Sequence, residues 1–281
     1  SWGDSVRVVR TFTDDLAALD ETLDVVARRV ARLDAEANEV AELASRDVWF
    51  GSIAADPRVG GTVGSTEISR EIGALQAYGT MKAKVTALRG LVALMAGMEG
   101  RKSLVLVAHH FGRYPGSEFY VGPRSAPVGA ANLRDGQHLL EELAAAANAS
   151  GVTFYGIYPY ERVAFASAAD SAALNPTTSS AAYGSGFDAI WSNEMAGLNF
   201  VTKRTGGSTA GHPGELPRFL DQVESDLGSY YSLGFPASGA AKPEAVKVRV
   251  RREGLSARTR TTVAERTAEE RLADRALANV F

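Results

Sequence analysis

The feature that most constrains the fold is an alternation of short apolar runs with an amphipathic segment. Residues 103–108 read Ser-Leu-Val-Leu-Val-Ala, a continuous apolar run of strand length. Leucines and alanines at helical spacing follow over 139–147, Gly151 ends that helix, and residues 152–158 predict a second strand. Strand, helix and strand in this order predict a right-handed parallel crossover. A strand without polar alternation is typical of a sheet buried on both faces.

The remaining segments predict further elements around this crossover. Residues 5–12 alternate apolar with polar side chains as a half-buried strand does, and Asp15 supplies N-cap chemistry for a long helix that begins at Leu16. Glycine and proline predict a loop over 51–66, and small residues predict another over 164–186. Apolar spacing predicts helices over 68–98, 188–205 and 213–227 and a third strand over 229–235.

The last part of the chain changes in character. Residues 246–250 and 257–263 alternate with a period of two around Glu253-Gly254, which predicts an antiparallel hairpin, and residues 268–280 predict a helix. The fold class predicted is therefore α/β: a doubly wound, mainly parallel sheet flanked by helices, with an appended C-terminal β-hairpin. We place the α/β domain over 1–235 and the extension over 236–281.

Composition excludes several classes of function. The formal net charge of -3 lacks the basic excess that binding to a phosphate backbone requires, so nucleic acid is not expected as a partner. Runs of about 18 apolar residues are absent, and no membrane span is expected in this chain. The absence of cysteine removes disulfides and thiolate chemistry.

Four segments in order carry a resemblance to a known family. They are 100–107 (Gly-Arg-Lys-Ser-Leu-Val-Leu-Val), 147–157 (Ala-Asn-Ala-Ser-Gly-Val-Thr-Phe-Tyr-Gly-Ile), Thr205-Gly206-Gly207 and 226–235 (Asp-Leu-Gly-Ser-Tyr-Tyr-Ser-Leu-Gly-Phe). Together they resemble the bacterial VWFA-related family, whose domains are von Willebrand factor A-like. The resemblance implies a non-enzymatic adhesion or protein-binding module that uses loops at the carboxyl edge of its sheet. It also implies a secreted, periplasmic or cell-surface location.

The metal-ion-dependent adhesion site of that family is degenerate here. The Asp-x-Ser-x-Ser motif does not occur, and Ala108-His109-His110 stands where the family has Ser-Asp-Gly. The remaining metal candidates, Thr62, Thr66 and His109, are weak ones. We therefore expect no metal cofactor, and we expect Mg²⁺ to bind only if an Asp-x-Ser-x-Ser motif lies upstream. The family's central strand is also missing. Either an upstream segment completes the sheet, or the strands are ordered differently.

The candidate binding residues lie in the loops that leave the two clear strands. We select His109, His110, Tyr114, Phe119, Tyr120, Tyr158 and Tyr160, with Tyr155 and Phe165 as further aromatic candidates. Aromatic side chains on such loops anchor protein partners, but they can equally pack the core. A different hypothesis is a zinc-dependent hydrolase in which His109 and His110 act with a carboxylate such as Asp135 or Glu118. A third is a structural subunit that assembles with copies of itself or with its missing upstream half.

Overall fold

The computed structural model describes part of the chain. These residues are 13, 15–25, 28, 63–98, 100–108, 110–120, 134–159, 180–231, 233, 244–255, 257–263, 267, 269, 272–273 and 275–276. Contacts divide the chain into one compact unit of residues 5–72 and another of residues 1–4 with 73–281. The sheet and its flanking helices belong to the second unit. The predicted strand over 5–12 and most of the predicted helix over 268–280 lie outside the described residues.

In the first unit, residues 16–25 are helical as the sequence predicts. The Asp15 carboxylate accepts hydrogen bonds from the backbone N–H groups of Ala17 and Ala18 at 3.0 and 3.2 Å, so it caps the helix.

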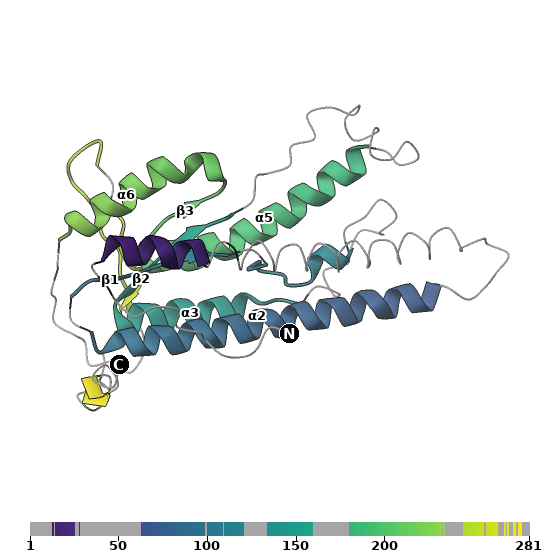
Figure 1. The fold of residues 1–281 in the computed structure, drawn as a ribbon, viewed down its shortest axis with the longest axis horizontal. Coiled ribbons are helices and arrows are strands. Elements are labelled where there is room, and N and C mark those ends of the chain that lie inside the picture. The colour runs from purple at the N-terminus through teal and green to yellow at the C-terminus, as the bar shows by residue number, and fades with distance from the viewer. Residues whose placement is uncertain are drawn as a thin grey trace. The chain divides into compact units, whose positions relative to one another are not determined.

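The second unit has a mixed α/β fold whose sheet is parallel and flanked by helices (Figure 1). The elements follow along the chain in this order: α2 (Val63–Ala96), β1 (Lys102–Val107), η1 (Ser117–Tyr120), α3 (Gln137–Ser150), β2 (Val152–Ile157), α5 (Ser180–Thr205), β3 (Thr209–Ala210), η3 (Pro213–Glu215), α6 (Leu216–Gly228), β4 (Glu244–Ala245) and β5 (Thr262–Val263). Within the described part, no helix is long and apolar enough to cross a bilayer.

The predicted crossover is confirmed. Strands β1 and β2 pair in parallel from Lys102 opposite Val152 to Val107 opposite Ile157, and α3 connects them. Helix α3 ends because Gly151 adopts the left-handed conformation at φ 73° and donates its N–H to carbonyls in the last turn. Such a fold of helices around a parallel sheet is compatible with a Rossmann-like architecture.

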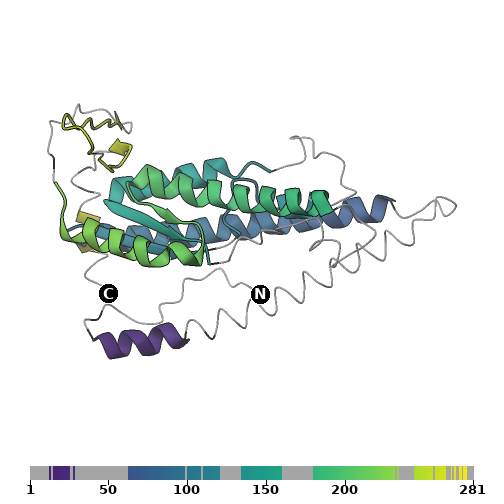
Figure 2. The same ribbon diagram turned by 90° about the horizontal axis from the view of Figure 1, so that it is seen from above.

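Helices cover the sheet on two sides, as Figure 1 and the view from above in Figure 2 show. Phe154 of β2 is fully buried in a core that α2, α3 and α5 build, whereas Tyr155, the next residue, packs against Phe219 of α6 on the other side. The alternation follows from the period-two geometry of a strand. Burying a side chain of this size stabilises the fold by about 1.5–3 kcal/mol.

The prediction that β1 is buried on both faces is wrong. Val105 and Val107 are 46% and 59% exposed, although Leu104 and Leu106 on the opposite face contact the core. In the described part β1 pairs only with β2, so its other edge has no partner strand there. The face that carries Val105 and Val107 is only partly covered by the described residues.

The third strand is not where the sequence predicts it. Residues 229–231 form no ladder, and Tyr231 is 96% exposed. Thr209 and Ala210 pair with Gly156 and Ile157 instead. Two residues are too few to give a periodic signal, which is why the sequence hides this strand.

Three other boundaries also differ from the prediction. Helix α2 begins at Val63, inside the predicted loop, because a long helix propagates through Gly64 at a cost of about 1 kcal/mol. Helix α5 begins at Ser180, inside the predicted loop over 164–186. The predicted hairpin is not confirmed: residues 246–250 are not in a strand, and only Glu244–Ala245 pair antiparallel with Thr262–Val263.

The amino end of the strands gathers the C-terminal ends of several helices. Lys102 donates to the Met98 carbonyl just beyond α2 at 2.9 Å, and Arg260 donates to the Gly151 carbonyl at the end of α3 at 2.9 Å. Thr261 donates its backbone N–H and its hydroxyl to the Arg204 carbonyl of α5. Helix C-termini have unpaired carbonyls and partial negative charge, so cationic donors stabilise them.

Candidate functional site

Five titratable side chains gather at the carboxyl ends of β1 and β2. Glu194 of α5 lies at the centre, and Lys84 of α2, His110 after β1, Glu118 of η1 and Tyr158 after β2 surround it. We call these five residues the Glu194 cluster. Open α/β sheets bind ligands outside the carboxyl ends of their strands, so the cluster occupies the edge where a functional site is expected.

Glu194 and Tyr158 are the buried members of the cluster, and His110 is the exposed one. The His110 Nδ1 atom lies 3.3 Å from Oε1 of Glu194 and 4.0 Å from Oε1 of Glu118. The side chain of Glu194 is 6% exposed, against 53% for His110 and 27% for Glu118. Among the described residues, Oε2 of Glu194 has no hydrogen-bond partner although it is buried.

The pKa values of the four surrounding groups are all shifted. A hydrogen bond to Glu194 raises the pKa of His110, and burial raises the pKa of Glu118. Burial lowers the pKa of Lys84, against the attraction of the two carboxylates. Burial, together with the charge of Glu194 and a hydrogen bond to it, raises the pKa of Tyr158 to about 12. Such shifts concentrate at functional sites.

The loop after β1 is fixed to α5 by Asn193, the neighbour of Glu194. Asn193 accepts from the Tyr114 N–H at 2.8 Å and donates to the Tyr114 carbonyl and to Ser117 Oγ, both at 3.0 Å. The Asn193 side chain thus bonds both the N–H and the carbonyl of Tyr114, as the backbone of a neighbouring strand would. The loop that carries His110 and Glu118 is consequently held in one position relative to Glu194.

Two glycines make this close approach possible. A Cβ on Gly197 would lie 1.9 Å from the Phe111 carbonyl oxygen, and one on Gly112 would lie 2.4 Å from Nδ2 of Asn193. Any side chain at either position would separate the loop from α5.

The backbone of His110 is itself unusual. Its φ is 51°, and it is the one non-glycine residue of the described part with positive φ. This left-handed conformation is uncommon for residues other than glycine, although histidine adopts it more often than most, as asparagine and aspartate do, and it is retained where surrounding contacts impose it. Here it directs the imidazole towards Glu194.

The structure places the sequence-selected residues in different surroundings. His110 and Glu118 come together, Phe119 is 37% exposed, and Tyr114 and Tyr120 are half-buried. Tyr158 is only 9% exposed, and Tyr155 is a fully buried core residue. Three selected residues and one metal candidate lie outside the described residues: His109, Tyr160, Phe165 and Thr62.

The alternative carboxylate Asp135 is not part of the cluster. Its Oδ1 accepts from the Gln137 N–H at 2.8 Å at the start of α3 and lies 3.8 Å from Arg113. Thr66 is helical, because α2 begins before it, so the prediction of a ligand loop there is wrong. In the described part, no group of three His, Cys, Asp or Glu side chains is arranged to hold a metal ion.

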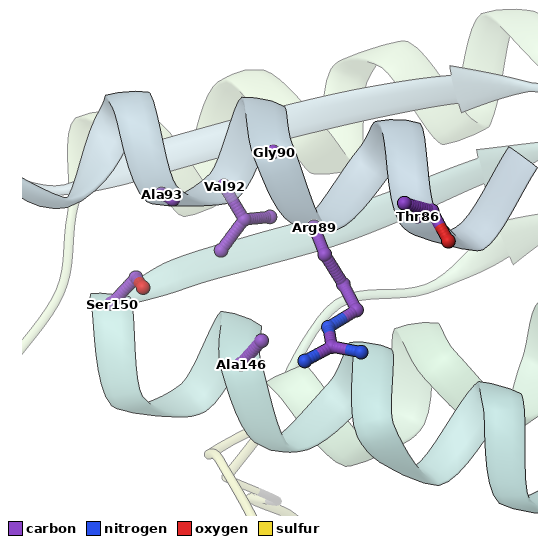
Figure 3. Close-up of a pocket in the computed structure, with 7 residues that line it drawn as sticks. All are labelled: Thr86, Arg89, Gly90, Val92, Ala93, Ala146 and Ser150. Carbon is purple, nitrogen blue, oxygen red and sulfur yellow. The ribbon is translucent and has the colours of Figure 1, made fainter. Parts of the chain in front are cut away.

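Two shallow grooves lie on the second unit. One, of about 450 Å³, runs between α2 and α3, and Figure 3 shows Arg89 reaching across it towards α3. Its polar side chains bond within the protein, since Arg89 pairs with Glu142 at 2.7 Å and Thr86 donates to the Lys82 carbonyl. The other, of about 340 Å³, lies at the carboxyl end of β3 and is lined by residues that include Met195 and His212.

Sequence reasoning missed Lys84, Asn193 and Glu194. All three lie within helices, where a charged or amide residue normally indicates a solvated face. One signal was present: Glu194 falls on the buried stripe that continues through Leu198 and Val201, so a carboxylate interrupts an apolar face.

Comparison with protein-family models, with curated proteins and with solved structures finds no match to this chain.

Proposed function

We propose that this chain is a non-enzymatic interaction module of the von Willebrand factor A-like type, which docks a protein partner at the carboxyl edge of its sheet. The observation that carries the proposal is the convergence of four shifted titratable groups on one buried carboxylate, Glu194, beside an aromatic loop. Groups with shifted pKa values at the ligand-binding edge of a parallel sheet favour a functional role for this cluster.

The loop after β1 has the properties of a docking platform. Phe119 is exposed at its end, and Tyr114 is half-buried with the guanidinium of Arg113 5.2 Å from its ring centre. Aromatic and arginine side chains are enriched among residues that dominate binding energy. The clamp by Asn193 means that little conformational entropy is lost when a partner binds, which favours affinity.

The resemblance to the VWFA-related family supports docking at the same edge of the sheet, because that family binds its partners through loops there. It also supports a location outside the bacterial cytoplasm, which we include in the proposal. The proposal includes no metal cofactor.

Hydrolysis is a second candidate function. The pair of His110 with a buried Glu194 favours it, because a carboxylate that orients an imidazole and raises its pKa is also a device of general-base catalysis. The zinc-dependent form needs His109 as well. Elemental analysis of the purified chain tests that form: stoichiometric zinc, lost together with a hydrolytic activity in His110→Ala, would favour hydrolysis over docking.

A photo-crosslinking amino acid tests the docking function. We would place it at position 119 on the proposed platform and, as a control, at position 220 on α6, where Leu220 is 49% exposed. Irradiation in the envelope fraction of the source organism should give a discrete adduct from position 119 alone. An adduct of twice the chain's mass would indicate self-assembly. Equal adducts from both positions, or none from 119, would reject docking at this edge.

A further inference from the structure

We infer that the Glu194 cluster binds a positively charged nitrogen group of the partner, a lysine ammonium or an arginine guanidinium, which donates a hydrogen bond to Oε2 of Glu194. This inference deepens the proposed function, on which it rests for the existence of a partner. It adds the chemistry by which the site would select that partner.

One oxygen of the Glu194 carboxylate is unsatisfied in the described part. Oε2 of Glu194 is buried and lacks a donor among the described residues, while Oε1 lies 3.3 Å from His110. A buried carboxylate oxygen without a donor costs about 1–3 kcal/mol or more. A ligand that supplies an N–H group recovers this cost, whereas a purely apolar ligand would not.

The charges of the cluster also favour a cationic ligand. The carboxylates Glu118 and Glu194 face one lysine, Lys84, and His110 provides a second cation only when it is protonated. With a neutral imidazole the cluster therefore has one more negative than positive charge. A single cationic group on the ligand balances it, and a charged donor forms a stronger hydrogen bond with a carboxylate than a neutral donor does.

Access of a ligand to Glu194 depends on His110. His110 lies between solvent and Glu194, its side chain is half-exposed, and its left-handed backbone is a less stable conformation. A cation that binds Oε2 of Glu194 lies beside the contact that His110 makes with Oε1. The Oε1 atom of Glu118 lies 4.0 Å from Nδ1 of His110, and this second carboxylate attracts the incoming cation.

Three small probes test the inference on the full chain without any partner. They are the N-acetyl methylamides of lysine, arginine and norleucine, the last being a neutral side chain of similar length. The His110 imidazole signals are followed by NMR during titration. The lysine or the arginine probe should shift these signals saturably and lower the pKa of His110, because a cation then lies near the imidazole. The norleucine probe should do neither.

Two variants locate the binding. Glu194→Gln should weaken binding of the charged probe by about tenfold or more, because the acceptor loses its charge. Glu142→Gln is the matched control: it removes a carboxylate that is 50% exposed and paired with Arg89, and probe affinity should stay within about twofold. If Glu194→Gln does not fold, Glu118→Gln should still weaken binding, by a smaller factor.

The outcomes separate this inference from the docking function. Equal responses to the lysine and norleucine probes, no response to either charged probe, or affinity unchanged in the folded Glu194 and Glu118 variants would overturn the cation site. A cross-link from position 119 would leave docking intact in those cases. Probe binding without any such cross-link would keep the cation site and reject docking.

Discussion

Gly197 of α5 lies against the carbonyl group of Phe111, with only 1.9 Å between that oxygen and the place where a Cβ would be. We therefore expect Gly197→Ala to destabilise the protein by about 1–3 kcal/mol, because the added methyl group must displace the loop or bend the helix. Urea unfolding followed by circular dichroism measures the change.

The same substitution at Gly79 is the control. A Cβ on Gly79 of α2 meets nothing within 4 Å, so Gly79→Ala should stabilise the helix by about 0.5–1 kcal/mol. Opposite signs at the two positions are the expected result. Equal effects would show that the contact between Gly197 and Phe111 does not constrain the fold.

Asn193 should govern the order of the loop after β1. Asn193→Ala removes one acceptor and two donor contacts, so we expect a loss of about 1–3 kcal/mol and faster hydrogen exchange at the Tyr114 amide. Ser192→Ala, at an exposed position of the same helix, should change neither. Unchanged exchange at Tyr114 in Asn193→Ala would contradict the clamp.

The His110–Glu194 pair predicts a pH dependence of stability. The pKa of His110 is raised above 6.5 in the folded state, chiefly by the hydrogen bond to Glu194. The folded state therefore holds this proton more tightly than the unfolded state does. The resulting stabilisation is complete below pH 6.5 and is lost as the pH rises through the raised pKa.

The measurement is the difference in unfolding free energy between the wild type and His110→Gln, determined from about pH 5 to pH 9. This difference should shrink as the pH rises, and NMR titration of His110 should give the pKa directly. A difference that grows with pH would contradict the assignment.

The exposed face of β1 predicts an effect on association. Val107 is 59% exposed on a strand whose second edge has no partner in the described part. Apolar edge strands promote contact between chains, and a lysine on the edge suppresses it. Val107→Lys should therefore lower concentration-dependent light scattering while thermal stability stays nearly constant. Leu220→Lys on α6 is the control, and an equal effect there would argue against the edge.

The crossover was predictable because its signals are local. The run over 103–108, the stripe through Leu139 and Leu143, and Gly151 each act through neighbouring residues, and the structure confirms them. Strand β3 was not predictable, since two residues give no periodicity. Strand β3 forms because its backbone pairs with the free edge of β2, and that pairing is a tertiary contact.

In the candidate site, too, some residues could be predicted from the sequence and others could not. His110 and Glu118 could be selected from their position after a strand, but Glu194 lies 84 residues beyond His110 in the sequence (194 less 110) and reaches it only through the packing of α5 on the loop. The pairing of Asn193 with Tyr114, 79 positions apart, is equally invisible to local patterns. Helical periodicity locates the face of a residue and says nothing about which loop will cover it.

The capping of α3 by Arg260 spans 109 positions, and Asn148 reaches Thr262 across 114. During synthesis on the ribosome, the end of α3 gains these contacts only after Arg260 and Thr262 have been made. Every member of the Glu194 cluster, in contrast, has been made once α5 is complete. Because translation runs in one direction, the contacts at the carboxyl ends of the strands, where His110 lies, can form first. The contacts at the amino ends of the strands form last.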